Sequence, residues 1–258
     1  MTTGSIVYLM YHELEIPGRR LCQSEPGYAR YVLPERNFRA QMDQLKGDGW
    51  QGLSISQALA FPEGRNVTIT FDDGCETDLL AAAPILRQAG FNATFFITRG
   101  RLGKDGYLSP AQLKELSGQG FEIGCHSMTH RYLTDLDASG LRHEISDAKS
   151  QLEQIIGQPV DHFSCPGGRC DRRVVTVARA AGYRTIATSR IQANSRNTDV
   201  FALGRVPMLR DVPLSAFAAI CEGSPLSRMR AQSAFREAAK QILGNSLYDR
   251  VRATLLAR

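Results

Sequence analysis

Two adjacent carboxylates stand directly after an apolar run. Asp72 and Asp73 follow residues 66–71 and precede Gly74. Neighbouring carboxylates repel each other and resist burial unless a cation compensates for their charge. A divalent metal bound to one of them would leave the other free to accept a proton. An isolated pair of this kind also suits a helix N-terminus, because helix-like sequence begins shortly afterwards.

A second pattern that could do chemistry is the pair His126 and His130, in the stretch HSMTH. Four-residue spacing puts both imidazoles on one face of a helical turn or across a tight loop, so both can reach one ion at about 2.0–2.1 Å. Together with Asp73 they make three ligands and leave a position open for water, as a catalytic metal site requires. Two polar histidines in an ordinary loop are the alternative, and Asp73 makes the metal interpretation the preferred one.

Strand-like and helix-like segments that alternate along the chain must position these side chains. Such alternation favours βα units around a mainly parallel sheet. We expect strands at 5–12, 66–71, 93–98, 121–125, 161–165, 185–189 and 201–209, and helices at 35–49, 77–90, 109–120, 141–156 and 171–182. About seven strands predict an α/β fold of the distorted (β/α) barrel type. An open doubly wound sheet is the alternative, but the chain lacks a GxGxxG or P-loop motif.

The candidate residues share a position relative to the expected strands. His12, Asp72, His126 and the segment 166–168 each follow the end of a different strand. The carboxyl ends of parallel strands meet at one edge of the sheet, where the active sites of such folds form. The four positions therefore predict one shared site.

TFDDG followed by HSMTH resembles the first two motifs of the polysaccharide deacetylase (NodB-homology, carbohydrate esterase family 4) family, and the resemblance runs from about Ser5 to Asp211. It implies a distorted barrel, one divalent metal ion (zinc first, with cobalt, nickel or manganese as alternatives) and hydrolysis of an N-acetyl amide or O-acetyl ester. Carried over by position, Asp72 is the general base, and Asp73, His126 and His130 are the metal ligands.

Later motifs of the family are altered in this chain. In FSCPGGR, Ser164 stands where the family has arginine and Gly167 where it has an aromatic residue, and Arg169 is a candidate for the missing cation. The tryptophan motif is absent, since the one tryptophan is Trp50. The predicted substrate-binding residues are Pro166, Gly167, Gly168, Arg169 and Arg205.

The general-acid histidine of the family is missing from its usual place, where VPMLRD offers Arg210. The first strand, VYLMYH, has the look of the strand that carries this histidine and ends at His12. The chain thereby resembles the circularly permuted poly-N-acetylglucosamine deacetylases, in which this strand comes first. On this interpretation His12 is the general acid; the alternative is that it only ends a strand.

Charge and composition limit the partners. Residues 228–258 hold seven basic and two acidic side chains and so account for the whole net charge of +5. A near-neutral body argues against nucleic-acid binding. We expect a catalytic domain at 1–214 and a basic amphipathic helical tail at 215–258, which either packs on the barrel or makes peripheral contact with an anionic membrane. Oligomeric state is not predicted.

The N-terminal residues and the cysteines indicate the cellular compartment of the protein. The apolar run before His12 is too short for a signal peptide, which predicts a cytoplasmic protein, either free or associated with a membrane. Six cysteines form no zinc-type pattern, and a cytosolic setting would keep them reduced. Cys165 and Cys170 could be a ligand or redox pair, although incidental thiols are the preferred interpretation.

The predicted function is removal of N-acetyl or O-acetyl groups from an N-acetylated sugar, polysaccharide or glycolipid. Two alternatives stay open: a metal-dependent amidase acting on a non-sugar substrate, and a degenerate member of the family that binds glycan without catalysis.

Overall fold

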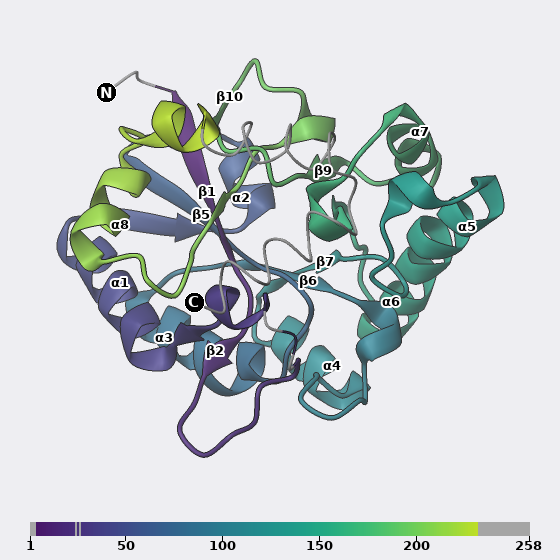
Figure 1. Ribbon diagram of the computed structural model, residues 1–258, viewed down its shortest axis with the longest axis horizontal. Helices are drawn as coiled ribbons and strands as arrows, with labels where there is room; N and C mark the ends of the chain where they lie inside the picture. Colours follow the sequence, from purple (N-terminus) through teal and green to yellow (C-terminus); the bar gives the residue numbers. More distant parts are fainter. Residues whose placement is uncertain (1–3, 24, 26, 232–258) are drawn as a thin grey trace.

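A curled sheet surrounded by helices forms the body of the protein in the computed structural model, which describes residues 4–23, 25 and 27–231 (Figure 1). Nine strands make the sheet, and parallel pairs connect all of them except β10 (Ala193–Ser195), which runs antiparallel to its neighbour. Helices cover its outside, so the arrangement is a distorted (β/α) barrel, as the alternating sequence pattern predicts.

Two neighbouring strands inside the sheet form a parallel pair. β1 (Ser5–Tyr11) lies beside β5 (Arg65–Phe71), with Tyr11 opposite Phe71. Both strands therefore end at the same level, and the residues that follow them, His12 and Asp72, emerge side by side. Beyond β5 come β6 (Thr94–Ile97), β7 (Glu122–Cys125), β8 (His162–Ser164) and β9 (Thr185–Ala187).

A short segment after β9 closes the barrel. Leu203 forms a bridge to Ala187 at the end of β9, and β11 (Val206–Pro207) pairs with Leu9 and Met10 of β1. The residues between these contacts cross from one sheet edge to the other. The expected strand at 201–209 is thus mostly wrong, because Val200–Ala202 form a 3-10 helix and Pro207 cannot donate a ladder hydrogen bond.

Helix boundaries follow local signals. The helices are α1 (Glu35–Gly47), α2 (Ile55–Leu59), α3 (Ala83–Ala89), α4 (Pro110–Gly118), α5 (Ala138–Arg142), α6 (Ala148–Ile156), α7 (Arg172–Ala180) and α8 (Leu214–Cys221). The Ser109 side chain accepts a hydrogen bond from the Gln112 amide at the start of α4 and so acts as the N-cap of this helix. Gly90 and Gly157 end α3 and α6 in the left-handed conformation.

Four short strands, β10 among them, and one helix are not predicted by the sequence pattern. β4 (Trp50–Leu53) pairs with the first half of β5 and is followed by α2, while β2 (Leu14–Glu15) and β3 (Leu33–Pro34) form a separate two-stranded sheet. Segments this short carry too few residues for a period to show.

The predicted domain boundary at 214 falls at the start of α8. Phe217, Ile220 and Cys221 of this helix are buried in the same core as the barrel, so this part packs on the domain. The remainder of the basic tail, residues 232–258, lies outside the described residues, and its helical and membrane-binding character stays a prediction. Within the described part of the chain, no helix is long and apolar enough to cross a membrane.

Candidate active site

The candidate metal ligands meet at the carboxyl edge of the sheet. Asp73 follows β5, while His126 and His130 follow β7, and their ligand atoms all lie within 4.8 Å of one another. His130 Nε2 is 3.3 Å and His126 Nε2 3.9 Å from Asp73 Oδ1. One carboxylate oxygen thus faces two imidazole nitrogens, which is a donor set that suits zinc and similar divalent ions.

The orientation of His126 supports this use. Its Nδ1 lies 2.9 Å from the Ser164 carbonyl oxygen, which can only accept a hydrogen bond, so Nδ1 carries the proton. The lone pair is then on Nε2, the nitrogen that faces Asp73. These residues fit a divalent ion without rearrangement of the imidazole of His126.

Unusual backbone conformations build the ligand loops. Asp73, Ser127 and His130 all have positive φ angles (85°, 70° and 65°), a conformation that costs residues with a side chain free energy. HSMTH is therefore a tight loop rather than a helical turn. The Ser127 hydroxyl accepts a hydrogen bond from the His130 amide, and Gly100 N–H donates to the Met128 carbonyl at 2.7 Å.

Gly100 allows its own segment to approach the histidine loop closely. A Cβ at this position would lie 2.6 Å from the Met128 oxygen, so only glycine allows the close approach. Together these contacts hold the two histidines on one side of the loop.

Asp73 has two further partners. Arg101 Nη1 is 2.7 Å from Oδ1, and Gln23 Nε2 donates to Oδ2 at 3.3 Å. Burial raises the pKa of Asp73, but the facing His130, with His126, His12 and Arg101, more than offsets this, so the pKa lies below its usual value. The carboxylate is ionised and ready to bind a cation.

Asp72 is paired with Arg205. Nη1 and Nη2 of this guanidinium lie 2.7 and 2.8 Å from the two Asp72 oxygens, and Nη2 also donates to the Ser164 hydroxyl at 2.7 Å. Arg205 is fully buried. Burial raises the pKa of Asp72, but the Arg205 charge, aided by His126, outweighs it and holds the pKa well below its usual value.

The segment that closes the barrel delivers Arg205. This residue lies between Leu203, bridged to β9, and Val206, paired with β1. Ser164 occupies the position where the family has arginine, and Arg205 thus supplies a guanidinium to the site from a different segment of the chain. Arg169, the candidate suggested by proximity in sequence, instead places its guanidinium 3.9 Å from the Tyr132 ring centre.

His12 lies next to these carboxylates. The Asp72 amide donates to the carbonyl of the preceding Tyr11, which fixes the two strand ends side by side. Burial lowers the pKa of His12, while the nearby Asp72 and Asp73 charges oppose the shift. Its Nδ1 is buried and has no hydrogen-bond partner among the described residues.

The third motif forms one side of the site. Pro166 is buried, and Gly167 and Gly168 both have positive φ angles of 62° and 70°. A Cβ at Gly167 would lie 2.7 Å from the Tyr132 ring, so this ring packs directly over the glycine. Tyr132 is 41% exposed and occupies the space beside the position where the family has an aromatic residue.

A cavity of about 510 Å³ lies at the opposite edge of the sheet, far from these groups. Its lining includes Ser56, Glu122 and His162, the last two being the first residues of β7 and β8. His162 and Glu122 are 3.4 Å apart and bonded to neighbouring groups. In barrels of this type the amino edge serves stability and the carboxyl edge serves chemistry.

Several known proteins with similar sequences are deacetylases by name. A family model described as "Polysaccharide deacetylase" matches residues 61–186. YxkH of Bacillus subtilis (strain 168), which carries a polysaccharide deacetylase name, is 30% identical over 74% of this chain and 70% of its own length. A peptidoglycan-N-acetylglucosamine deacetylase of Bacillus cereus is 36% identical over 48% of this chain and 56% of its own.

Solved structures share the fold. The Streptococcus pyogenes deacetylase PplD superposes with a TM-score of 0.73 at 23% identity, covering 84% of this chain and 98% of PplD. IcaB from Ammonifex degensii gives a TM-score of 0.71 at 23% identity, covering 85% and 97%. The chain belongs to the polysaccharide deacetylase family, and the resemblance of its motifs to that family is confirmed.

Three contacts of the site were not anticipated from the sequence: Arg205 with Asp72, Tyr132 with Gly167, and Gln23 with Asp73. Arg205 was expected among the substrate-binding residues, but its donors contact Asp72, Ser164 and neighbouring groups inside the protein. Each contact joins residues far apart in the chain, so no local pattern marks it.

Proposed function

We propose that this protein is a metal-dependent deacetylase that hydrolyses the acetamido group of an N-acetylated sugar, polysaccharide or glycolipid. The observation that carries the proposal is the convergence of Asp73 Oδ1 with His126 Nε2 and His130 Nε2, beside Asp72. A bound divalent ion there would polarise the acetyl carbonyl and make an attacking water more acidic.

The chain's own groups supply the remaining chemistry. Asp72, kept ionised by Arg205, is the base that accepts the proton of the attacking water. The amine that leaves must gain a proton, and His12, next to Asp72 at the end of β1, is the group we assign to deliver it. An O-acetyl ester needs this proton less, because an alkoxide leaves more readily than an amide anion.

The order of strands supports the assignment of His12. It follows the first strand of the chain, yet this strand lies inside the sheet, between β10 and the strand that carries Asp72. This placement is what a circularly permuted arrangement requires.

Substrate contact is assigned to the rim of the site. The Tyr132 side chain packs against Gly167 and the Arg169 guanidinium but stays 41% exposed, and this exposed part of the ring is a surface that a sugar can contact. Deacetylase names among the relatives support a carbohydrate substrate, including N-acetylglucosamine polymers.

Acetate release tests the proposal. The zinc-loaded protein is incubated with N-acetylglucosamine oligomers and with peptidoglycan, alongside chelator-treated protein and the Asp72→Asn variant. We expect release by the loaded protein only. Metal binding without release would favour an amidase on a non-sugar substrate, and neither binding nor release would favour a glycan-binding role.

A further inference from the structure

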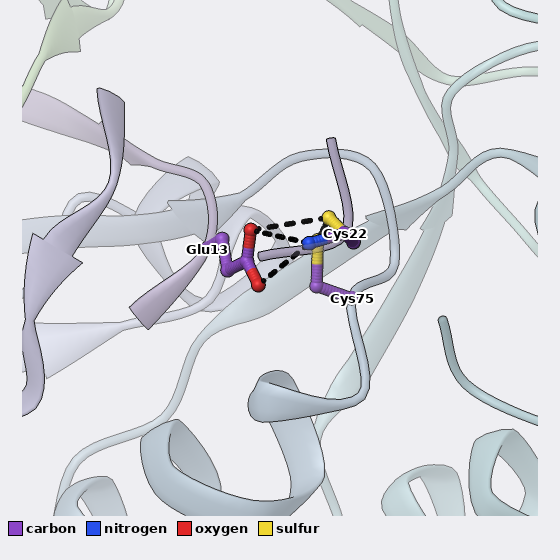
Figure 2. Close-up of side chains that lie close together, drawn as sticks. All are labelled: Glu13, Cys22 and Cys75. Atoms are coloured by element: carbon purple, nitrogen blue, oxygen red, sulfur yellow. Dashed lines mark hydrogen bonds between the residues drawn. The ribbon is translucent and has the colours of Figure 1, made fainter. Parts of the chain in front are cut away.

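Two thiols outside the proposed metal site lie in contact with each other. Cys22 Sγ and Cys75 Sγ are 2.8 Å apart, although 53 positions separate them in the chain. Cys22 is half-buried, in the loop between β2 and β3, and Cys75 is buried two residues after Asp73. Figure 2 shows both sulfurs beside the Glu13 carboxylate.

Backbone contacts hold the two cysteines together. A Cβ at Gly106 would lie 2.7 Å from Cys22 Cβ, so the Cys22 loop is pressed against that glycine. The neighbouring Tyr107 forms a β-bridge with Cys75. The backbones of Cys22 and Cys75 therefore both contact one segment, at the consecutive residues Gly106 and Tyr107.

Glu13 holds Cys22 in position. Both of its carboxylate oxygens accept the Cys22 amide proton at 3.1 Å, and Oε2 also accepts from the Cys22 thiol at 3.2 Å (Figure 2). The Tyr28 hydroxyl lies 3.1 Å from the same sulfur. A carboxylate that already receives the thiol proton is placed to remove it when Cys22 attacks a disulfide.

We propose that Cys22 and Cys75 form a reversible disulfide that clamps the Cys22 loop onto the carboxylate Asp73. The alternative is that Glu13, Cys22 and Cys75 bind a zinc ion. Two thiolates bound to one tetrahedral zinc at about 2.3 Å each stand about 3.8 Å apart. The observed separation is well below this, and the Glu13 oxygens are already engaged by Cys22.

The oxidant is a small-molecule or protein disulfide, and the reaction is thiol–disulfide exchange. The Cys22 sulfur attacks one sulfur of the incoming disulfide, forms a mixed disulfide and expels one thiolate. The Cys75 sulfur then attacks the Cys22 sulfur and expels the second. The two thiol protons pass to the leaving thiolates; the protein sulfurs lose two electrons and the incoming disulfide gains them.

The clamp reaches the metal site through Gln23, the residue after Cys22. Its amide donates to Asp73 Oδ2, whereas the other oxygen, Oδ1, faces the two histidines. Hydrogen bonds of this kind orient a ligating carboxylate, and losing one typically costs 10–100-fold in metal affinity or activity. Fixing the loop keeps Gln23 in place, so the oxidised protein binds the metal more tightly. This consequence rests on the proposed function; the disulfide itself does not.

Thiol mapping tests the disulfide first. Metal-free protein is treated with oxidised glutathione, alkylated, digested and analysed by mass spectrometry, and Cys221→Ser serves as the control because this buried cysteine lies elsewhere, in α8. We expect a Cys22–Cys75 peptide in the wild type and the control, and none in Cys22→Ser or Cys75→Ser. Full alkylation of Cys22 and Cys75 after oxidation would overturn the proposal, as would a parallel sample of reduced, zinc-loaded protein in which a second zinc ion protects both thiols from alkylation.

Metal affinity tests the clamp. Zinc binding is measured by competition with a chromophoric chelator in the oxidised and reduced states. We expect affinity about threefold to tenfold higher in the oxidised wild type, and no dependence on redox state in Cys22→Ser or in Gln23→Ala. Equal affinity in both states of the wild type would refute the clamp, while absence of zinc binding in either state would refute the proposed function and leave the thiol result standing.

Discussion

Replacing Arg205 with methionine tests how the proposed base is kept ionised. The guanidinium is fully buried and makes two ionic hydrogen bonds to Asp72. Methionine fills much of the same space but leaves the carboxylate buried without its cation. Removing one partner of a buried ion pair typically costs about 3–5 kcal/mol. We therefore expect the free energy of unfolding to fall by about 3 kcal/mol.

The effect on activity follows from the Asp72 pKa. Burial alone raises this pKa, and Arg205 is the largest opposing influence, so its loss shifts the pKa upward. A carboxyl group that is protonated cannot act as a base, and a general base typically contributes about 10²–10⁴-fold to the rate. We expect acetate release at pH 7 to fall by about 100-fold or more, and to recover partly as pH rises through the new pKa.

Two controls make the interpretation specific. Arg169→Met removes the other candidate cation, which lies over Tyr132 at the rim, and should leave the pH profile unchanged. Asp72→Asn combined with Arg205→Met should be more stable than Arg205→Met alone, because no unpaired buried carboxylate remains. The reasoning is refuted if Arg205→Met keeps wild-type activity with an unchanged pH profile, or if Arg169→Met reproduces its effects.

Further predictions concern other groups. His12→Gln should slow acetamide hydrolysis at least about 100-fold but ester hydrolysis much less; equal losses on both substrates would exclude the acid role. Tyr132→Ala should raise KM for sugar oligomers several-fold with little change in kcat, because the proposed contact of the ring is with bound sugar and not with the reacting acetyl group; an unchanged KM in steady-state assays would remove Tyr132 from the binding surface. At the opposite edge, burial raises the pKa of Glu122, but hydrogen bonding and charge from His162 outweigh it and lower the pKa from 4.5 to about 2. The ionised form thus contributes stability that is complete above about pH 5 and is lost as pH falls toward 2, so Glu122→Gln should lower the free energy of unfolding by about 1–3 kcal/mol at pH 7 and by roughly half as much or less at pH 3. Urea unfolding at both pH values measures this difference, and a loss that does not depend on pH would argue against the ionic origin.

The amino-acid sequence alone determined the fold class and the edge that carries the site. Each βα unit is long enough to show its period, and caps such as Ser109 and Gly90 act on their own segments. Strand-end positions then predicted that Asp73 and His126 would meet, because parallel strands align their carboxyl ends. Local interactions within a segment are visible in its own sequence.

Only the tertiary structure decided what surrounds those residues. Arg205 pairs with Asp72 because the segment from Leu203 to Val206 closes the barrel beside it. Tyr132 packs on Gly167 because the two loops that carry them meet there. Cys22 reaches Cys75 in the same way. These contacts depend on how the sheet curls and where loops pack. Such packing minimises the free energy of the whole chain, so it leaves no periodic or short-range trace in any one segment.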